Sequence, residues 1–207
     1  MTLTNSYATM AMLKAELNIG QADTSYDTKL EMALNAASRQ IDRHCGRRFW
    51  QDPAVVQREY YADNAYDCFT DDISTTTGLV VRVDDNGDGT YATTLTNTTN
   101  YILLPRNADH EVPDLPFTQI RLVDSGITAF PIWSSGRPGV RVTAKFGWPA
   151  VPDDVEKACL IQATQLFKAS DAVFGGLNFD GSILRVRETL NPMAAALVEF
   201  YVKPRVA

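Results

Sequence analysis

The chain of 207 residues is long enough to bury a hydrophobic core without disulfides or structural metals. Apolar residues make up 45% of it and charged residues 21%, which excludes a disordered chain, and its apolar runs are far shorter than the roughly 20 residues that cross a bilayer. The net charge of -6 disfavours sequence-specific DNA binding, because Lys and Arg contacts to phosphates supply most of that affinity.

The first 52 residues predict two helices. Thr9 suits the N-cap of a short helix that ends near Leu17, and Gly20 follows as a stop. A longer helix is predicted from about Ser25 to Cys45, with Gly46 as its end. Apolar residues at spacings of three and four give this helix one buried stripe, made of Leu30, Leu34, Ala37, Ile41 and Cys45.

After Pro53 the pattern changes to short β-branched and aromatic runs separated by turn residues. Six strands are predicted, at Val55 to Tyr61, Leu79 to Val83, Tyr91 to Leu95, Tyr101 to Leu104, Gln119 to Val123 and Val140 to Phe146. Residues 53–150 hold 7 basic and 12 acidic residues and therefore carry nearly all of the net charge. This segment is predicted to form a small antiparallel β domain.

Helices return after Pro152. One is predicted to run to about Ala169, and the sequence Asn191-Pro192 is a strong start signal for a last helix that reaches about Val202. We therefore predict an α+β fold. Both ends of the chain, residues 1–52 and 150–207, would form a helical bundle, and residues 53–149 would form an inserted β domain.

No pattern of a known catalytic or cofactor site is present in the sequence. The two histidines, His44 and His110, lack the setting of a nucleophilic active site, and there is no Gly-rich phosphate loop. Three distant cysteines, Cys45, Cys68 and Cys159, are predicted to be buried free thiols. We expect a protein that is not an enzyme and needs no cofactor. The polar N-terminus lacks a secretion signal, which predicts that the protein stays in the cytoplasm where it is made.

The run Asp84 to Thr90 resembles the first half of a calcium loop, because acidic and amide residues alternate ahead of Gly89. A helical calcium loop needs Glu at its twelfth position, which here is Leu95. Asn-Gly and Asp-Gly supply the positive φ angles of a hairpin turn, which we favour as the interpretation. Calcium binding stays open as the alternative.

Two groups of residues are candidates for an interface. Arg39, Arg43 and Arg47 recur every four residues and predict a basic ridge on the long helix, either simply solvated or facing acidic partners. Near the C-terminus, Phe174 and Phe179 are flanked by glycines in a stretch without helical periodicity, which predicts either a partner surface for the two rings or a disordered loop. The tail from Lys203 through Pro204 and Arg205 can lie extended against a neighbouring protein.

Several stretches resemble the head-tail connector, or adaptor, proteins of tailed bacteriophages, in the longer form with a β insert. In the first flank these are Tyr7 to Thr9, Leu13 to Leu17, Ala36 to Asp42 and Cys45 to Phe49. In the second flank they are Val142 to Pro149, Val151 to Val155, Ala158, Gln162 to Ala163, Leu166 to Lys168, Phe174 to Gly175 and Asn191 to Pro192. Residues from about Tyr60 to Arg137 match only as the usual place for an insert.

The resemblance implies a structural protein of the virion neck, assembled in the host cytoplasm as a ring that usually has twelve subunits. Its partners would be the portal protein, the next neck or tail-completion protein and DNA that passes through the lumen without sequence-specific binding. No membrane is implied.

Two alternatives remain open. A carbohydrate-binding or host-binding module would use Tyr60, Tyr61, Tyr66 and Trp133 for stacking on sugar rings. A metal-dependent hydrolase would need Asp63, Asp67, Asp71 and Asp72 to converge, although an acidic loop is the simpler interpretation of these residues.

Overall fold

A computed structural model describes residues 5–110, 114–123, 129–133, 136–174 and 190–203, with only the backbone of residues 109 and 170–174. The chain divides into two compact units, one made of Met1–Phe49 with Val151–Ala207 and the other of Trp50–Ala150. We call them the helical unit and the β unit. The predicted α+β class is confirmed, since the described residues form four α-helices and two antiparallel sheets.

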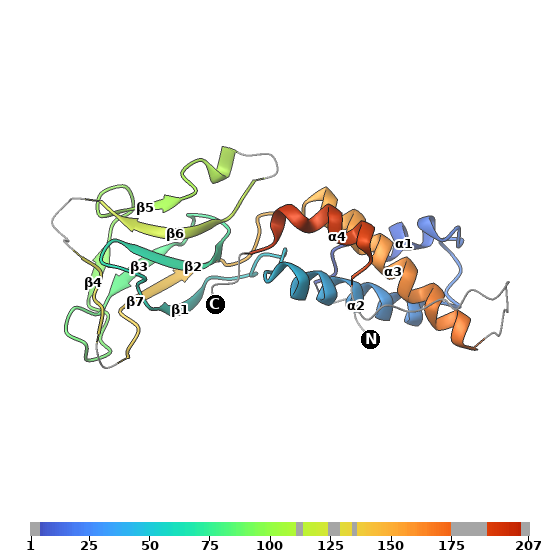
Figure 1. Cartoon of the computed structure of the whole chain (residues 1–207), viewed down its shortest axis with the longest axis horizontal. Helices are drawn as coiled ribbons and strands as arrows, with labels where there is room; N and C mark the ends of the chain where they lie inside the picture. The colour runs from blue at the N-terminus through green and yellow to red at the C-terminus, as the bar shows by residue number, and fades with distance from the viewer. Residues whose placement is uncertain (1–4, 111–113, 124–128, 134–135, 175–189, 204–207) are drawn as a thin grey trace. The chain divides into compact units, whose positions relative to one another are not determined.

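The helical unit contains segments from both ends of the chain (Figure 1). Its elements are α1 (Met10–Glu16), α2 (Asp27–Cys45), α3 (Asp153–Phe174), α4 (Pro192–Val198) and the 3-10 turn η2 (Glu199–Tyr201). Helix α3 contacts the other three helices, and α2 also contacts α1 and α4. Ser38 Oγ of α2 lies 3.5 Å from Cys159 Sγ of α3, so the two longest helices meet at buried side chains.

Local signals set the ends of these helices. Thr9 caps α1 by accepting a hydrogen bond from the Met12 N–H at 3.2 Å, and Asn191 caps α4 by accepting one from the Met193 N–H at 2.9 Å. Gly46 ends α2 with a φ of +65°, where a side chain would be strained. The predicted start and stop residues are confirmed at these three positions.

The described residues of the β unit form seven strands in two antiparallel sheets. They are β1 (Val56–Tyr60), β2 (Asp67–Ile73), β3 (Val80–Val83), β4 (Thr93–Leu95), β5 (Tyr101–Leu104), β6 (Phe117–Leu122) and β7 (Val140–Ala144), with a short 3-10 turn at Ala108–His110. One sheet has the order β1-β7-β3-β4 and the other β2-β6-β5. Alternate residues of these strands face a common apolar core, which includes Cys68, Val81, Ile120 and Val142.

Strand β2 is a correction to the sequence prediction, which treated Asp67, Asp71 and Asp72 as part of an acidic loop. The strand carries Cys68 and Thr70 on its buried side, while Asp67, Phe69 and Asp71 alternate with them. Because Asp is uncommon in strands, the acidic residues made the alternation of buried and exposed positions hard to recognise from the sequence. Other boundaries also shift: for example, α3 continues to Phe174 rather than Ala169, η2 closes the last helix, and β6 begins at Phe117 rather than Gln119.

The two ends of the β unit lie side by side. The Asp52 N–H donates to the Phe146 carbonyl at 2.8 Å, and the Gly147 N–H donates to the Asp72 carbonyl at 2.7 Å. Gly147 has a φ of +107°, and a Cβ there would lie 1.9 Å from the Trp50 carbonyl oxygen. Only glycine permits this close approach of two backbone segments.

All three cysteines are free and buried, as predicted. Burial raises the pKa of the Cys45 and Cys68 thiols to about 12. Within the described ranges, every helix is too short or too polar to span a membrane. The predicted domain boundaries, and the idea that the two flanks fold together as a bundle, stay predictions.

Candidate interaction surfaces

Arg39 belongs to a network that attaches the N-terminal segment to α2. Its Nε lies 3.0 Å from an Asp42 carboxylate oxygen, and its guanidinium donates to the Asn5 carbonyl at 3.0 Å. The Tyr7 hydroxyl donates to the same Asp42 and accepts from the Phe49 N–H at 2.9 Å. Burial raises the pKa of Asp42, although the hydrogen bond from Tyr7 and the charge of Arg39 act against that shift. Part of the hydrogen-bonding capacity of Arg39 is therefore taken up by contacts within its own subunit.

The predicted ridge of three arginines on one helix is wrong for Arg47. Gly46 takes a left-handed conformation and ends α2, so Arg47 lies beyond the helix. Arg39 and Arg43 remain one turn apart on α2, and Arg43 is exposed. The sequence shows the four-residue spacing of the arginines. The chain changes direction at Gly46, so Arg47 does not continue the line of Arg39 and Arg43 along the helix.

Lys203 is held at the end of α2. Its backbone N–H donates to the Cys45 carbonyl at 2.9 Å, a group that the helix itself leaves without a partner. The chain after η2 therefore returns to the C-terminal end of α2, close to Gly46. Phe174 is the last residue of α3, and its side chain lies outside the described part of the structure, as do Phe179, Pro204 and Arg205.

Sequence reasoning missed an exposed apolar surface on the helical unit. Met193 in α4 and Phe200 in η2 have exposed fractions of 66% and 77%, and Met32 on α2 is 55% exposed. The available signal was the spacing of Met193, Leu197 and Phe200, at positions i, i+4 and i+7 of one helix face. Short apolar helices are normally buried, so this spacing alone does not predict an exposed face.

The four aromatic residues proposed for sugar stacking do not form one platform. Trp133 packs its ring on Gly87 and donates its indole N–H to the Asp84 carbonyl at 3.1 Å. Tyr60 is partly buried and donates its hydroxyl to Asp71 at 3.0 Å. Tyr61 and Tyr66 are exposed, and the Tyr61 hydroxyl donates to the Gly136 carbonyl at 3.0 Å. Three of the four side chains are thus committed to contacts within the β unit.

The four proposed metal-binding carboxylates are also held apart. Asp67 and Asp71 are four residues apart on β2, roughly 13 Å along a strand. Asp67 accepts from Arg121 at 2.6 Å, Asp71 accepts from Arg58 at 2.5 Å, and Asp63 accepts from the Phe69 N–H at 2.7 Å. Asp72 is buried. Among the described residues, no three His, Cys, Asp or Glu side chains come close enough to hold one metal ion.

The Asp84 to Thr90 run forms the connection between β3 and β4. Asp84 is buried and accepts hydrogen bonds from the N–H groups of Asn86, Gly87 and Gly89, at 3.3, 2.8 and 2.8 Å. Burial would raise the pKa of Asp84, but these hydrogen bonds together lower it below the ordinary value. Gly87 and Gly89 have positive φ angles, as the hairpin interpretation requires. The Asp84 carboxylate is therefore occupied with its own turn.

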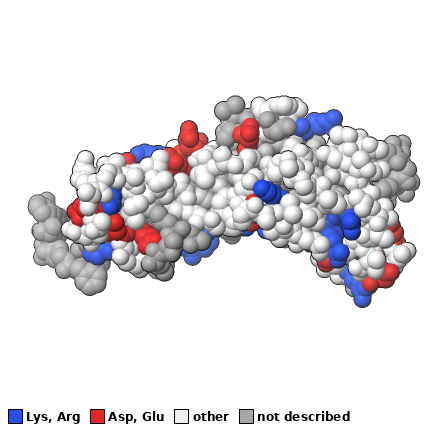
Figure 2. All heavy atoms as spheres, turned by 180° about the vertical axis from the view of Figure 1, so that it is seen from behind, with Lys and Arg blue, Asp and Glu red and all other residues white. Residues whose placement is uncertain are grey.

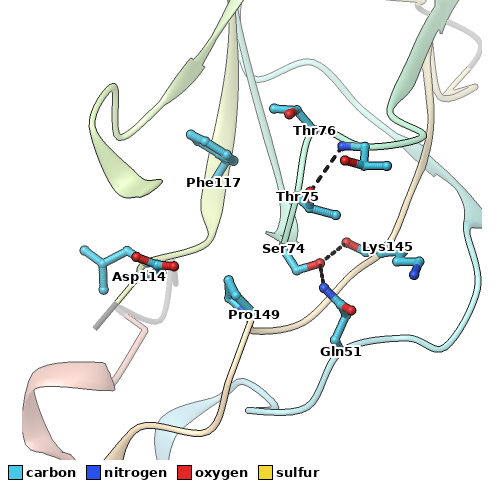
Figure 3. Close-up of a pocket in the computed structure, with 10 residues that line it drawn as sticks. Gln51, Ser74, Thr75, Thr76, Asp114, Phe117, Lys145 and Pro149 are labelled. Atoms are coloured by element: carbon cyan, nitrogen blue, oxygen red, sulfur yellow. Dashed lines mark hydrogen bonds between the residues drawn. The ribbon is translucent and has the colours of Figure 1, made fainter. Parts of the chain in front are cut away.

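An open pocket of about 500 Å³ lies in the β unit (Figure 3). It is lined by Gln51, Ser74, Thr75, Thr76, Thr77, Asp114, Leu115, Phe117, Lys145 and Pro149. The Ser74 hydroxyl donates to the Lys145 carbonyl at 2.9 Å and accepts from the Gln51 amide at 2.8 Å. These groups satisfy one another, and the lining residues include no paired nucleophile and base.

Charged side chains are intermixed on the face drawn in Figure 2. Among the residues coloured there, neither the basic nor the acidic side chains merge into one broad patch. Nucleic-acid-binding surfaces are usually marked by a broad basic patch, so this face differs from them.

No model of a known protein family matches the chain, and no curated protein matches its sequence. Solved structures do resemble it. A chain from the neck of an empty GTA particle, computed with C6 symmetry, is 19% identical with a TM-score of 0.55, and the match covers 100% of this chain and 95% of that one. A chain from the neck of the native GTA particle, computed with C12 symmetry, is 18% identical over 100% and 94%, with a TM-score of 0.55. A chain from the virion of a native gene transfer agent particle is 17% identical over 100% and 95%, with a TM-score of 0.52. The fold of the present chain is therefore that of these chains, over its whole length.

Proposed function

We propose that this chain is a structural head-to-tail adaptor in the neck of a tailed, phage-like particle. Identical copies would form a ring below the portal, link the capsid to the tail and let DNA pass through the centre. The ring would assemble in the host cytoplasm and remain in the virion. In this role the protein acts through its surfaces, with no catalytic residue and no cofactor.

One observation carries the proposal, the likeness in fold to chains of a particle neck. It covers all of this chain and nearly all of the other, so it includes the helical unit and the β unit alike. A shared helix pair or a shared β domain alone would say much less, because such parts recur in unrelated proteins. The sequence resemblance to connector proteins supports the same role independently.

A ring of twelve subunits is favoured by the symmetry of one neighbour, whose neck was computed with C12 symmetry. Closed rings of identical subunits need two different complementary surfaces on each copy. The net charge of -6 suits a lumen through which DNA must slide, since a wall rich in Lys and Arg would hold the phosphates. Arg43 and the C-terminal tail, Lys203 to Ala207, are proposed contacts with neighbouring copies or with the portal.

The test is to add the purified full-length chain to tail-less heads that contain the portal. We expect each head to gain the mass of twelve copies of a 22.9 kDa chain at the portal vertex, and tails then to join. A matched sample of heads without portal should gain no such mass. A chain that leaves portal-containing heads unchanged, in mass and in tail joining, would contradict the proposed function.

The tail provides a sharper version of the same test. The Lys203 N–H is bonded to the Cys45 carbonyl, so a truncation should begin after Lys203 to leave the fold intact. The chain without residues 204–207 should stay folded but bind portal-containing heads more weakly. Normal tail joining by this truncated chain would show that the tail is dispensable.

A further inference from the structure

Helix α4 and the turn after it are apolar on two sides. Ala194, Val198 and Tyr201 are buried within the helical unit. On the outward side lies a second stripe, which we call the α4 outer stripe, made of Met193, Ala196, Leu197 and Phe200. The large side chains at its two ends, Met193 and Phe200, are among the most exposed apolar side chains of the described residues. A surface of this kind usually marks a protein–protein contact.

Helix α2 presents a matching stripe to the solvent. It lies opposite the buried residues Leu30, Leu34 and Ile41. We call it the α2 outer stripe, and its residues are Met32, Ala36, Arg39 and Arg43. Met32 and Ala36 are exposed and make its first half apolar, whereas the two arginines make its second half basic. Apolar and basic groups are thus arranged along one line of the helix.

The two stripes have the same spacing. Met32, Ala36 and Arg39 stand at positions i, i+4 and i+7 of α2, and Met193, Leu197 and Phe200 stand at positions i, i+4 and i+7 of α4 and η2. Seven residues correspond to roughly 10 Å along a helix. Side by side in the same direction, the apolar halves would meet at Met193 and Met32. Phe200 would then lie near the arginines, which favour the face of an aromatic ring.

Charge also distinguishes this pairing from α4 against itself. Residues 192–201 contain one charged side chain, the exposed Glu199, and no Lys or Arg. Two α4 stripes facing each other would bring only acidic groups together. Against α2, Glu199 can approach the exposed Arg43, so the complementary charges select α2 as the partner surface.

We propose that the α4 outer stripe of one copy docks on the α2 outer stripe of the next copy of this chain. The inference rests on the proposed ring function and names its subunit contact. Because the two surfaces differ, the contact is head-to-tail, and it closes a ring when each copy is related to the next by a pure rotation that divides a full turn. The stripe is small, so ring closure, in which every copy is held on two sides, supplies much of the stability.

Cross-linking tests the contact directly. The three native thiols are buried, so Met32→Cys and Met193→Cys each add one accessible thiol to the chain. A mixture of the two variants, treated with a short bis-maleimide on portal-containing heads, should give far more covalent dimer than either variant alone. The variant with both substitutions should give a ladder of multimers. Tyr66 on the β unit is about as exposed as Met32, so Tyr66→Cys serves as the control partner for Met193→Cys and should give little product.

Each result decides one point. Dimers from Met193→Cys alone at the same yield would show a two-fold contact and overturn the proposal, as would the absence of cross-linking in the mixture. If heads gain the full ring mass without the cross-link, the contact is wrong while the adaptor function stands. If heads gain no mass, the adaptor function itself fails. Cross-linking of Met193→Cys to the portal rather than to a second copy would assign the α4 stripe to the portal instead.

A charge exchange gives an independent readout. Glu199→Arg and Arg43→Glu should each reduce the amount of chain bound per head by several fold, because like charges then face each other. The double variant should restore binding toward the unsubstituted level. Both residues are exposed, so the fold should tolerate the changes, which circular dichroism would verify. A double variant that binds no better than the single ones would overturn the pairing.

Discussion

Gly147 is a single residue on which the β unit depends. A Cβ at this position would overlap the Trp50 carbonyl oxygen, and the φ of +107° disfavours any side chain. We therefore expect Gly147→Ala to destabilise the β unit by about 3 kcal/mol or more, from backbone strain together with the clash. Urea unfolding followed by tryptophan fluorescence measures this. Gly20→Ala is the matched control, because a Cβ there meets no atom within 4 Å. Equal midpoints for the two variants would contradict the expectation.

At the residue scale, the sequence predicted the features that depend on near neighbours. Thr9, Gly46 and Asn191 act on backbone groups within a few residues, so their roles can be read from local pattern. Gly147 and the Lys203 backbone act on segments far away in the chain, at Trp50 and Cys45. No local pattern specifies such a partner, which is why neither role was predicted.

Among the elements, β2 shows how a strand can be hidden by its charges. Asp67 faces Arg121 across the β2–β6 pair, and its carboxylate also accepts from Gln119 at 2.7 Å and from Asn64 at 3.2 Å. Acidic residues are poor strand formers when considered alone. Here Arg121 and Gln119 come from a strand more than fifty residues away, and the sequence does not reveal that pairing.

The same ion pair makes stability depend on pH. The hydrogen bond from Arg121, aided by Asn64 and Gln119, lowers the pKa of Asp67. Folding thus favours the ionised form, so the stability that Asp67 contributes is complete above the ordinary Asp pKa and disappears as the pH falls through the lowered value.

Asp67→Asn should cost about 1–2 kcal/mol of unfolding free energy at neutral pH. That difference should shrink toward zero in acid, as measured by unfolding at several pH values. Asp85→Asn, at an exposed turn residue, should change little, and a pH-independent cost for Asp67→Asn would argue against this origin.

For the whole molecule, the proposal that both flanks form one folded helical domain can be tested by limited proteolysis. Contacts between the flanks include the Gln162 amide, which donates to Gln40 at 2.7 Å, and the buried Ser38 and Cys159 pair. We expect the first cuts in loops of the β unit, such as residues 84–92, and the two helical parts should stay together in size-exclusion chromatography. Mass spectrometry of the eluted material would identify both parts. Their separation under native conditions would mean that the flanks do not share one core.

The hydrogen bond between Asp52 and Phe146 also bears on the order of folding. The helical unit consists of two segments separated by the whole of Trp50–Ala150, and joining the ends of a flexible loop of about 100 residues costs roughly 4 kcal/mol of chain entropy. Once the β unit has folded, Asp52 and Phe146 near its two ends are already neighbours, so α2 and α3 can meet as if they were close in sequence. Contacts that would otherwise form slowly then become effectively local. A folded β unit thus holds the ends of the two flanking segments, Met1–Phe49 and Val151–Ala207, close together. We expect the helices to form faster in stopped-flow refolding when the β unit is already folded.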